Sequence, residues 1–510
     1  MTSRIACDVV VVGGGSSGCV VAGRLATESD ARVVLVEAGP DYGPRTSGRW
    51  PADLLDGGAL VTSHDWGYGS GEIAGREPVA FPRARVIGGC SSHNGCVVAV
   101  GCPADYDGWV AASGDDRWRA DAIRPALARA LGRLAVRTYG EDEVGPFHRA
   151  CLDAAVALGL PRADDLDDLD GGLGFGIEPV NIDGGVRVNA AFAYVDPARA
   201  CPNLTILDRA LCDRVVSTGA GVEVFVRRDG QEVRVVAETV VLSAGAYGSP
   251  AILQRSGIGD PADLRAAGIA PLVDLPGVGR NLHDHPIVEL EFAGSERLRQ
   301  LLAESASARF TPEEQTLGKL RSSRATGPYD LHLFPVAAHP LSLLAGRVLL
   351  VIAAMEPRSR GWLRVAGADP EAEPVIEHGY LSDPEGSDRA VLAEGIERAR
   401  ELAATEPLRA LIGAEIPPSL DHAIEQIHAH YYHPVGTCAM GAEADPLAVC
   451  DGAGRVRGIA GVVVADCSLM PVVPRANTNL PAVIVGERIA DALLAGERED
   501  RGSGLLRSTR

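Results

Sequence analysis

The chain has 510 residues, of which 46% are hydrophobic and 23% are charged, and its formal net charge is −20 at pH 7. This composition describes a globular protein rather than a disordered one, and the length favours two closely joined domains over a single core. The strongly acidic balance argues against nucleic acid and anionic membranes as partners.

The start of the chain and its cysteines predict a cytoplasmic location. An apolar strand begins almost at once, which leaves no room for a signal peptide. The longest apolar stretch, Leu341–Met355, contains Arg347 and is too short to span a bilayer. The eleven cysteines are scattered without C-x-x-C pairs, so we expect free thiols in a reducing compartment.

The first forty residues have the pattern of a dinucleotide-binding βαβ unit. Val9–Val12 is an unbroken β-branched run, which predicts a parallel strand buried on both faces. Three glycines with the G-x-G-x-x-G spacing follow it: Gly13, Gly15 and Gly18. Such glycines let the backbone turn tightly and approach a pyrophosphate, and the next helix, which continues through Leu25, presents its free N–H groups to that anion.

A second strand and an acidic residue complete this unit. The apolar run Val33–Val36 predicts the strand, and Glu37 follows it directly. A carboxylate about twenty residues after the glycines can accept the ribose hydroxyls. Strand, glycines, helix, strand and acid in register predict a dinucleotide site rather than an ordinary tight turn.

Two loop-rich segments come next. Residues 41–76 are rich in Gly, Pro, Ser and Trp and predict an irregular excursion over the cofactor. Residues 81–109 place a glycine pair, two hydroxyls, a histidine and an asparagine within a few positions. A loop of this kind offers many backbone donors and close approach, which suits a flavin ring and its phosphates. The acidic stretch 164–170 does not match the EF-hand template and predicts a solvated loop.

The rest of the chain alternates between the two patterns. In chain order we expect helices at 121–131 and 148–158, strands at 204–218, 222–228 and 238–244, a helix at 251–259, strands at 329–336 and 347–354, helices at 388–406 and 420–430, a strand at 461–465 and a helix at 480–494. The glycine loops vanish between about 287 and 431 and the cofactor pattern returns in the tail, so the cofactor fold must be discontinuous.

We therefore expect an α/β protein with a Rossmann-like cofactor domain and an inserted α+β substrate domain, built from an antiparallel sheet plus helices. The expected cofactor domain comprises residues 1–145, 190–286 and 433–510. The substrate domain, with its connecting segments, comprises 146–189 and 287–432.

Six motifs, in this order, carry a resemblance to a known family: VVVGGGSSGCVVAGRLA with VVLVEAGP, ARVIGGCSSHNGCV with DYDGW, AGAYGSPAILQRSGIG, LPGVGRNLHDHP, YYHPVGTCAMG, and VADCSLMPVVPRANTNLPAVIVGERIAD. Over essentially its whole length the chain resembles the glucose–methanol–choline oxidoreductases, flavoenzymes that oxidise alcohols. The resemblance implies FAD rather than NAD, with the flavin ring facing the inserted domain. Besides the glycines and Glu37 above, it assigns these residues to FAD: Ser16, Ser17, Ala38, Val86, Gly88, Gly89, Ser92, His93, Asn94, Gly95, Cys96, Val97, Cys212, Ala244, Asp466 and Thr478.

The resemblance also implies a catalytic pair. In the family, the histidine of the H-P-x-G-T motif sits at the flavin beside a His or Asn, and here these residues are His433 and Asn477. An imidazole can take the hydroxyl proton near neutral pH, and an amide can orient the hydroxyl and stabilise alkoxide character. The neighbouring His428 and His430 could suggest a metal site, but no acid or cysteine completes a ligand set. We expect an exposed helix end there, and no metal.

The segment SSHN is similar to the flavin loop of choline oxidases, which implies a covalent bond between His93 and the flavin 8α-methyl carbon. The alternative is a histidine that is only hydrogen-bonded within the loop. Other positions depart from those enzymes: Gly95 stands where a serine is expected, and Tyr431 where a small aliphatic residue is. No aromatic cage for a quaternary ammonium precedes Tyr329, which disfavours choline itself.

Four residues are candidates for the wall of the substrate pocket: His332, Phe334, Tyr431 and Tyr432. Ordinary core packing is the alternative for each of them. The function expected is oxidation of a small polar alcohol, primary or secondary, to a carbonyl by hydride transfer to flavin N5, with oxygen or another electron acceptor. Two rival functions are a non-redox lyase with a structural flavin, on the same fold, and a non-catalytic FAD-binding protein with a decayed site.

Overall fold

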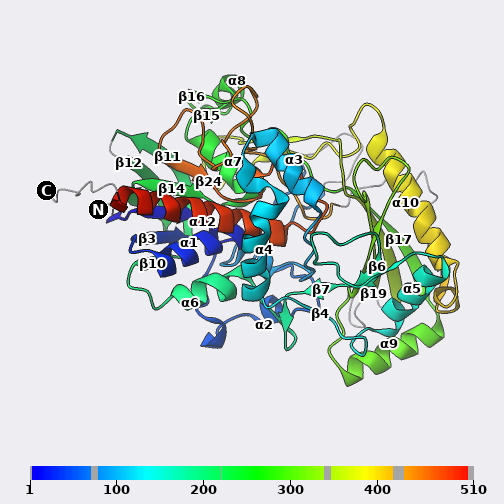
Figure 1. Ribbon diagram of the computed structural model, residues 1–510. Helices are drawn as coiled ribbons and strands as arrows, with labels where there is room; N and C mark the ends of the chain where they lie inside the picture. Colours follow the sequence, from blue (N-terminus) through cyan, green and yellow to red (C-terminus); the bar gives the residue numbers. More distant parts are fainter. Residues whose placement is uncertain (1–2, 71–78, 220, 338–345, 417–429, 503–510) are drawn as a thin grey trace.

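The computed structural model describes residues 3–70, 79–219, 221–337, 346–416 and 430–502. Two sheets organise it, one on each side of the view in Figure 1. The blue and red ends of the chain gather around the parallel sheet, and the second sheet lies beside the yellow helix α10 (Ser387–Ala403). Within these residues, no helix has the length and apolar character needed to cross a membrane.

The parallel sheet has five strands in the order β10–β3–β2–β14–β24. Their bounds, in that order, are Leu204–Leu207, Val33–Val36, Val9–Val12, Thr239–Leu242 and Val462–Val464. Every residue of β2 and β3 is buried, as is usual for parallel strands covered on both faces. The apolar runs that predicted these two strands match them residue for residue.

Helices and a second, smaller sheet cover the parallel sheet. Helix α1 (Ser16–Glu28) packs on β2 and β3, α12 (Asn479–Gly502) packs along α1, and α4 (Ala120–Arg133) packs on α12. The smaller sheet has the order β1–β13–β12–β11, with bounds Ser3–Ala6, Gln231–Ala237, Gly221–Arg228 and Ala210–Thr218. These layers fix the carboxyl ends of β2 and β3 beside the N-terminus of α1.

The substrate-side sheet has seven strands in the order β23–β17–β20–β19–β18–β6–β5. Their bounds are Ile412–Glu415, Ile287–Gly294, Arg347–Ala354, Leu331–Ala337, Thr316–Leu320, Gly174–Ile177 and Arg162–Ala163. All neighbours are antiparallel except β5 and β6. Helix α10 packs on this sheet, as do α5 (Pro146–Ala157) and α9 (Glu296–Ala308).

Alternation along these strands gives the sheet two different faces. Leu290, Leu333 and Ile352 belong to the apolar core under the helices. Phe334 and Val351 point the other way and line a cavity. The strand pattern therefore decides which side chains can meet a substrate.

The remaining elements connect the two sheets. The helices are α2 (Ala52–Leu55), α3 (Pro103–Ser113), α6 (Asp196–Ala198), α7 (Gly245–Arg255) and α8 (Pro261–Ala266), with single turns at Arg45–Ser47, Gly89–Ser92, Asp116–Trp118, Ala191–Val195, Leu408–Ala410 and Cys467–Leu469. The short strand pairs are β4 (Arg137–Thr138) with β7 (Pro179–Val180), β8 (Ile182–Asp183) with β9 (Val186–Arg187), β15 (Ile258–Gly259) with β16 (Val273–Asp274), and β21 (Trp362–Arg364) with β22 (Val375–Glu377).

The predicted fold class is confirmed, since a parallel sheet and an antiparallel sheet with helices are both present. One helix differs clearly from its prediction: α7 begins at Gly245, six residues before the expected start at 251, because the glycine-containing turn after β14 is already helical. The helix expected at 420–430 lies outside the described residues except for His430, and Leu341–Met355 does so in part. The proposed domain bounds stay a prediction.

Candidate functional site

A cavity of about 740 Å³ lies between the two halves of the molecule. Its lining runs from the glycine turn after β2 to side chains of β17, β19 and β20. Ligands of open α/β sheets bind outside the carboxyl ends of the parallel strands, and this cavity occupies that position. It is therefore the candidate site for both cofactor and substrate.

Most residues expected to bind cofactor or substrate line this cavity. They are Gly13, Gly15, Ser16, Ser17, Glu37, Ala38, Gly89, His93, Asn94, Gly95, Val97, Cys212, Ala244, Phe334, Tyr431, Tyr432, His433, Asp466, Asn477 and Thr478. Six further candidates are buried behind the lining: Gly18, Val86, Gly88, Ser92, Cys96 and His332. The functional role of each residue remains a prediction.

The glycine turn is shaped for close approach of a ligand to the backbone. Gly13 has a φ of +98°, and a Cβ there would lie 2.4 Å from the carbonyl oxygen of Ser243. Gly18 serves packing instead, since its Cβ would lie 1.9 Å from the carbonyl oxygen of Gly13. Gly15 caps α1 without any side-chain hydrogen bond, so the helix presents unpaired N–H groups toward the cavity.

Glu37 lies at the carboxyl end of β3, where the ribose hydroxyls are expected. One carboxylate oxygen accepts from the backbone N–H of Gly14 at 2.8 Å, and the other accepts from Gly39 at 2.7 Å. Each oxygen keeps a second lone pair for a ligand hydroxyl. Burial raises the pKa of Glu37, and the two backbone donors oppose that shift.

Buried polar atoms without partners support a bound cofactor and substrate. Nε2 of His93, Oδ1 of Asn477 and Nδ2 of Asn479 are all buried at this cavity without a hydrogen-bond partner in the described part of the chain. Unpartnered buried polar atoms are rare in folded proteins. Together with the glycine turn and Glu37, they fit a flavin dinucleotide that fills the cavity.

His93 has one ring nitrogen without a partner: its Nε2 is buried and makes no hydrogen bond with the described residues. Burial lowers the pKa of His93 to about 4, because a charged imidazolium is costly away from water. At neutral pH the side chain is therefore a neutral imidazole, with its unpartnered Nε2 at the cavity.

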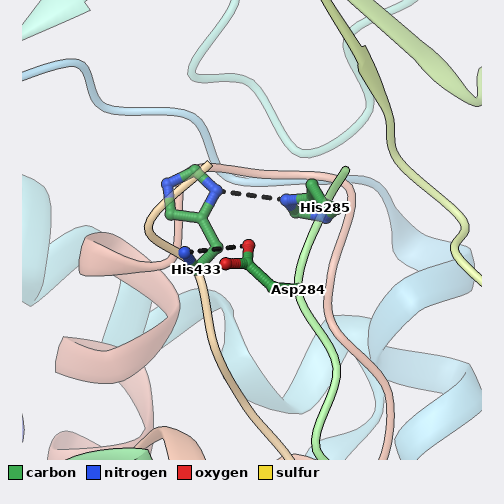
Figure 2. A group of neighbouring side chains, drawn as sticks. All are labelled: Asp284, His285 and His433. Carbon is green, nitrogen blue, oxygen red and sulfur yellow. Dashed lines mark hydrogen bonds between the residues drawn. The ribbon is translucent and has the colours of Figure 1, made fainter. Parts of the chain in front are cut away.

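The catalytic candidates come from two chain segments that run antiparallel to each other. Backbone bridges join His283 to Val435 and Pro286 to His430, and this register sets His285 opposite His433. Figure 2 shows the result: the Nδ1 atoms of His285 and His433 are 3.1 Å apart. The backbone N–H of His433 donates to Oδ1 of Asp284 at 3.0 Å, and this bond fixes the backbone that carries the His433 ring.

The second ring nitrogen of His433 points away from His285 in Figure 2. No described residue hydrogen-bonds to it, and His433 lines the cavity. Burial lowers the pKa of His433 well below its usual value, and the neighbouring His285 adds to this. Burial also lowers the pKa of His285, to about 3. Both rings are therefore neutral at physiological pH, and one of them has a free nitrogen at the cavity.

The carboxyl group of Asp284 is buried, but a nearby arginine and several hydrogen-bond donors favour its charged form. Burial raises its pKa to about 7, opposed by the charge of Arg83 and by the donors on its oxygens. The hydroxyl of Tyr380 donates to Oδ2 at 3.0 Å. Asp284, His285 and His433 could also hold a metal ion. Because the Nδ1 atoms of the two histidines already lie 3.1 Å from each other, we assign a hydrogen bond between them rather than a shared ion.

Aromatic rings form the wall beside the base. Phe334 and Tyr431 stack with centroids 4.9 Å apart, and Tyr431 lies 4.3 Å from the His433 ring. Burial raises the pKa of Tyr431 well above its usual value, and the nearby Asn477 side chain opposes this shift. His332 lies further in and stacks on Tyr329 at 5.8 Å. The described part of the chain thus brings Phe334, Tyr431, His433 and Asn477 together at one end of the cavity.

Comparison with protein families decides the relationship. A family model described as GMC oxidoreductase matches residues 7–287, and a second model with the same description matches residues 357–486. The chain belongs to the GMC oxidoreductase family. It is accordingly an oxidoreductase that acts on CH–OH groups, and membership of the family implies FAD as its cofactor.

Relatives of this GMC oxidoreductase cover nearly its whole length. Choline oxidase of Arthrobacter globiformis is 34% identical over 95% of this chain and 94% of its own. The 5-(hydroxymethyl)furfural oxidase of a Methylovorus species is 34% identical over 96% and 98%. Among solved structures, pyridoxine 4-oxidase from Mesorbium loti superposes with a TM-score of 0.83 at 29% identity, over 95% of this chain and 99% of the other.

The GMC oxidoreductase site contains residues that sequence reasoning did not assign. Asp284 and His285 lie inside the motif LPGVGRNLHDHP, which carried the family resemblance, but only the fold brings them to His433. Glu314 lines the cavity without belonging to any motif. The motif could therefore have pointed to Asp284 and His285 as site residues, whereas no sequence pattern pointed to Glu314.

One expectation about this GMC oxidoreductase was wrong. His430 was predicted at an exposed helix end, but it is 7% exposed, and its Nε2 bonds to the carbonyl of Ala80 at 2.8 Å. Its ring packs edge-on against Phe81. The pairing of this segment with Pro286 turns the side chain inward. His428 lies outside the described residues.

Proposed function

We propose that the protein oxidises a small polar alcohol, primary or secondary, to the corresponding carbonyl compound, with His433 as the base and Asn477 as its partner. FAD, when bound, supplies the hydride acceptor at its N5 atom. The observation that carries the proposal is the geometry of His433, whose Nδ1 is engaged by His285 while its other ring nitrogen is free at the cavity.

His433 is suited to take the proton of the substrate hydroxyl. Because burial keeps the imidazole neutral, its lone pair is available without prior deprotonation. Asn477 lies at the same end of the cavity, and its amide N–H groups can donate to the hydroxyl oxygen and then to the developing alkoxide. Phe334 and Tyr431 exclude water from one side of this position.

We further propose that Nε2 of His93 would bond to the 8α-methyl carbon of FAD, replacing one of its C–H bonds, with the proton lost to solvent and the two electrons passing through the flavin ring to dioxygen. The free, neutral Nε2 at the cavity supports this, and a protonated nitrogen would not act as a nucleophile. In a His93→Ala variant, flavin colour should move from the pellet to the supernatant on acid precipitation. Colour that stays in the supernatant of the wild type would contradict the bond.

Dioxygen is the electron acceptor that we propose to test first, because several relatives are named as oxidases or as oxygen-dependent. Formation of hydrogen peroxide in step with the carbonyl product is the expected result. A reducing, cytoplasmic location is supported by the eleven cysteines, all of which are free thiols in the structure.

The deciding experiment is anaerobic mixing of the purified flavoprotein with candidate alcohols. The alcohol should bleach the visible absorbance band of the flavin. The rate of bleaching should fall about 10²–10⁴-fold in His433→Ala. Turnover of an alcohol without any bleaching would favour a lyase with a structural flavin. Unchanged bleaching in His433→Ala would remove His433 from the reaction.

A further inference from the structure

Arg187 is a fully buried cation that forms no ion pair with any carboxylate in the described part of the chain. It is the last residue of β9, and it has no exposed surface. The hydrogen bonds of its guanidinium go to backbone carbonyl oxygens. Charged side chains are almost never fully buried unless they are paired, so the positive charge at this position needs an explanation.

The carbonyl groups around Arg187 belong to the flavin loop and to the segment that precedes it. Nε donates to the carbonyl of Asn94 at 3.1 Å, and Nη1 donates to that of Ser92 at 3.2 Å. These two residues flank His93 in the chain. The other acceptors are the carbonyls of Asp53, Leu54 and Ala59. The guanidinium is therefore fixed against the loop that is expected to hold the flavin.

The charge of Arg187 acts on the cavity. His93 lines the cavity, and its pKa is lowered by burial and further by the charge of Arg187, whereas Asp65 opposes this shift. Carbonyl dipoles hold a guanidinium in place, but they do not neutralise its charge. The ring of a flavin gains negative charge when it is reduced. A fixed cation beside this cavity would therefore favour the reduced form over the oxidised form.

We propose that Arg187 is a positioning residue of the flavin site, whose guanidinium holds the loop on both sides of His93 and whose charge raises the reduction potential of bound FAD. The proposal requires FAD, which membership of the family implies, but neither an alcohol substrate nor the covalent bond through His93. The alternative is a purely structural role, in which only the hydrogen bonds to the loop matter. The two roles differ in what the charge itself contributes.

Three variants separate the charge from the hydrogen bonds. Arg187→Lys keeps the charge and has three N–H donors for the carbonyl groups, whereas Arg187→Gln keeps an amide donor but no charge. Arg32→Gln is the control, since it removes one positive charge from the exposed surface. All three are made in a His93→Ala background, so that no bond between His93 and the flavin contributes to the potential.

The reduction potential of the bound FAD is measured by anaerobic reduction in the presence of a reference dye. Arg187→Gln should lower the equilibrium constant for reduction at least tenfold, which is about 30 mV for a two-electron couple. Arg187→Lys and Arg32→Gln should stay within about threefold of the background, or about 15 mV. An unchanged potential in Arg187→Gln, or an equal fall in Arg187→Lys, overturns the inference.

The lysine variant also decides the question alone, should Arg187→Gln not take up FAD. A potential within about threefold of the background then supports a role of the charge, and a tenfold fall overturns it. Since the measurement involves no alcohol, failure here and failure of the proposed function are separate results.

Discussion

The Nδ1 atoms of His285 and His433 are 3.1 Å apart, with their rings at 84° to each other. One proton sits in this bond, and its position decides whether His433 can act as a base. For the cavity-side nitrogen of His433 to accept a proton, Nδ1 of His433 must be the donor and Nδ1 of His285 the acceptor. The remaining N–H of His285 then lies at Nε2, which has no hydrogen-bond partner among the described residues.

Removing His285 should therefore impair the base without touching the substrate. In His285→Leu, Nδ1 of His433 loses its acceptor, and the tautomer with a free cavity-side nitrogen is no longer favoured. We expect kcat/KM to fall about 10–100-fold, as for other groups that orient a reacting side chain. Flavin content and Tm serve as controls for folding. An unchanged kcat/KM in a flavin-loaded variant would show that His285 does not set the tautomer.

The pH dependence of the reaction should report the lowered pKa of His433. Burial holds that pKa well below 6.5, so the ring stays unprotonated, and active as a base, as the pH falls through the usual histidine range. With an uncharged alcohol, kcat/KM should lose activity only well below pH 6.5, where the buried ring finally binds a proton. The measurement is kcat/KM between about pH 5 and 9. A descending acid limb centred at or above 6.5 would contradict the prediction.

The sequence predicted those parts of the fold that depend on local pattern. The β-branched runs Val9–Val12 and Val33–Val36 and the glycines between them follow from strand burial and backbone geometry, which neighbouring residues determine. The contact between His285 and His433 spans 148 positions. It depends on the antiparallel register of two loop segments, and no local pattern encodes that register.

Side-chain direction was the second limit of the sequence. Helical spacing predicted an exposed end at His430, but pairing of this segment with Pro286 buries it. Alternation along β19 correctly put His332 and Phe334 on one face, yet only Phe334 reaches the cavity. Whether a side chain on that face reaches the cavity depends on which other side chains cover it. Here Tyr431 packs against His332.

The glycine turn offers a test with a matched control. In Gly13→Ala the new Cβ would meet the backbone of Ser243 at 2.4 Å, at a φ of +98°. The strain alone should cost about 1–3 kcal/mol, and the displaced turn should weaken FAD binding. Gly132→Ala, in the last turn of α4 with no atom near its Cβ, should be neutral or stabilising by up to about 1 kcal/mol. Equal Tm values and flavin contents in the two variants would show that the turn tolerates a side chain.

Arg475 holds the segment that carries Asn477 in place. Its guanidinium pairs with Asp105 in α3 and with Glu356 after β20, so it ties the cofactor side to the substrate side. Its backbone N–H donates to Asp105 at 3.1 Å, and its carbonyl accepts the hydroxyl of Tyr329 at 2.8 Å. The side chain is nearly buried, as is that of Asp105.

Breaking this pair should therefore cost both stability and activity. Arg475→Met leaves Asp105 charged and without its cation, which for buried pairs typically costs about 3–5 kcal/mol. The exposed pair of Arg398 and Glu401 on α10 provides the control, and Arg398→Met should change stability by no more than about 1 kcal/mol. Denaturant unfolding measures both, and kcat of Arg475→Met should fall with KM less affected, because Asn477 loses its fixed position. If Arg475→Met unfolds like Arg398→Met and keeps its kcat, the ion pairs do not position Asn477.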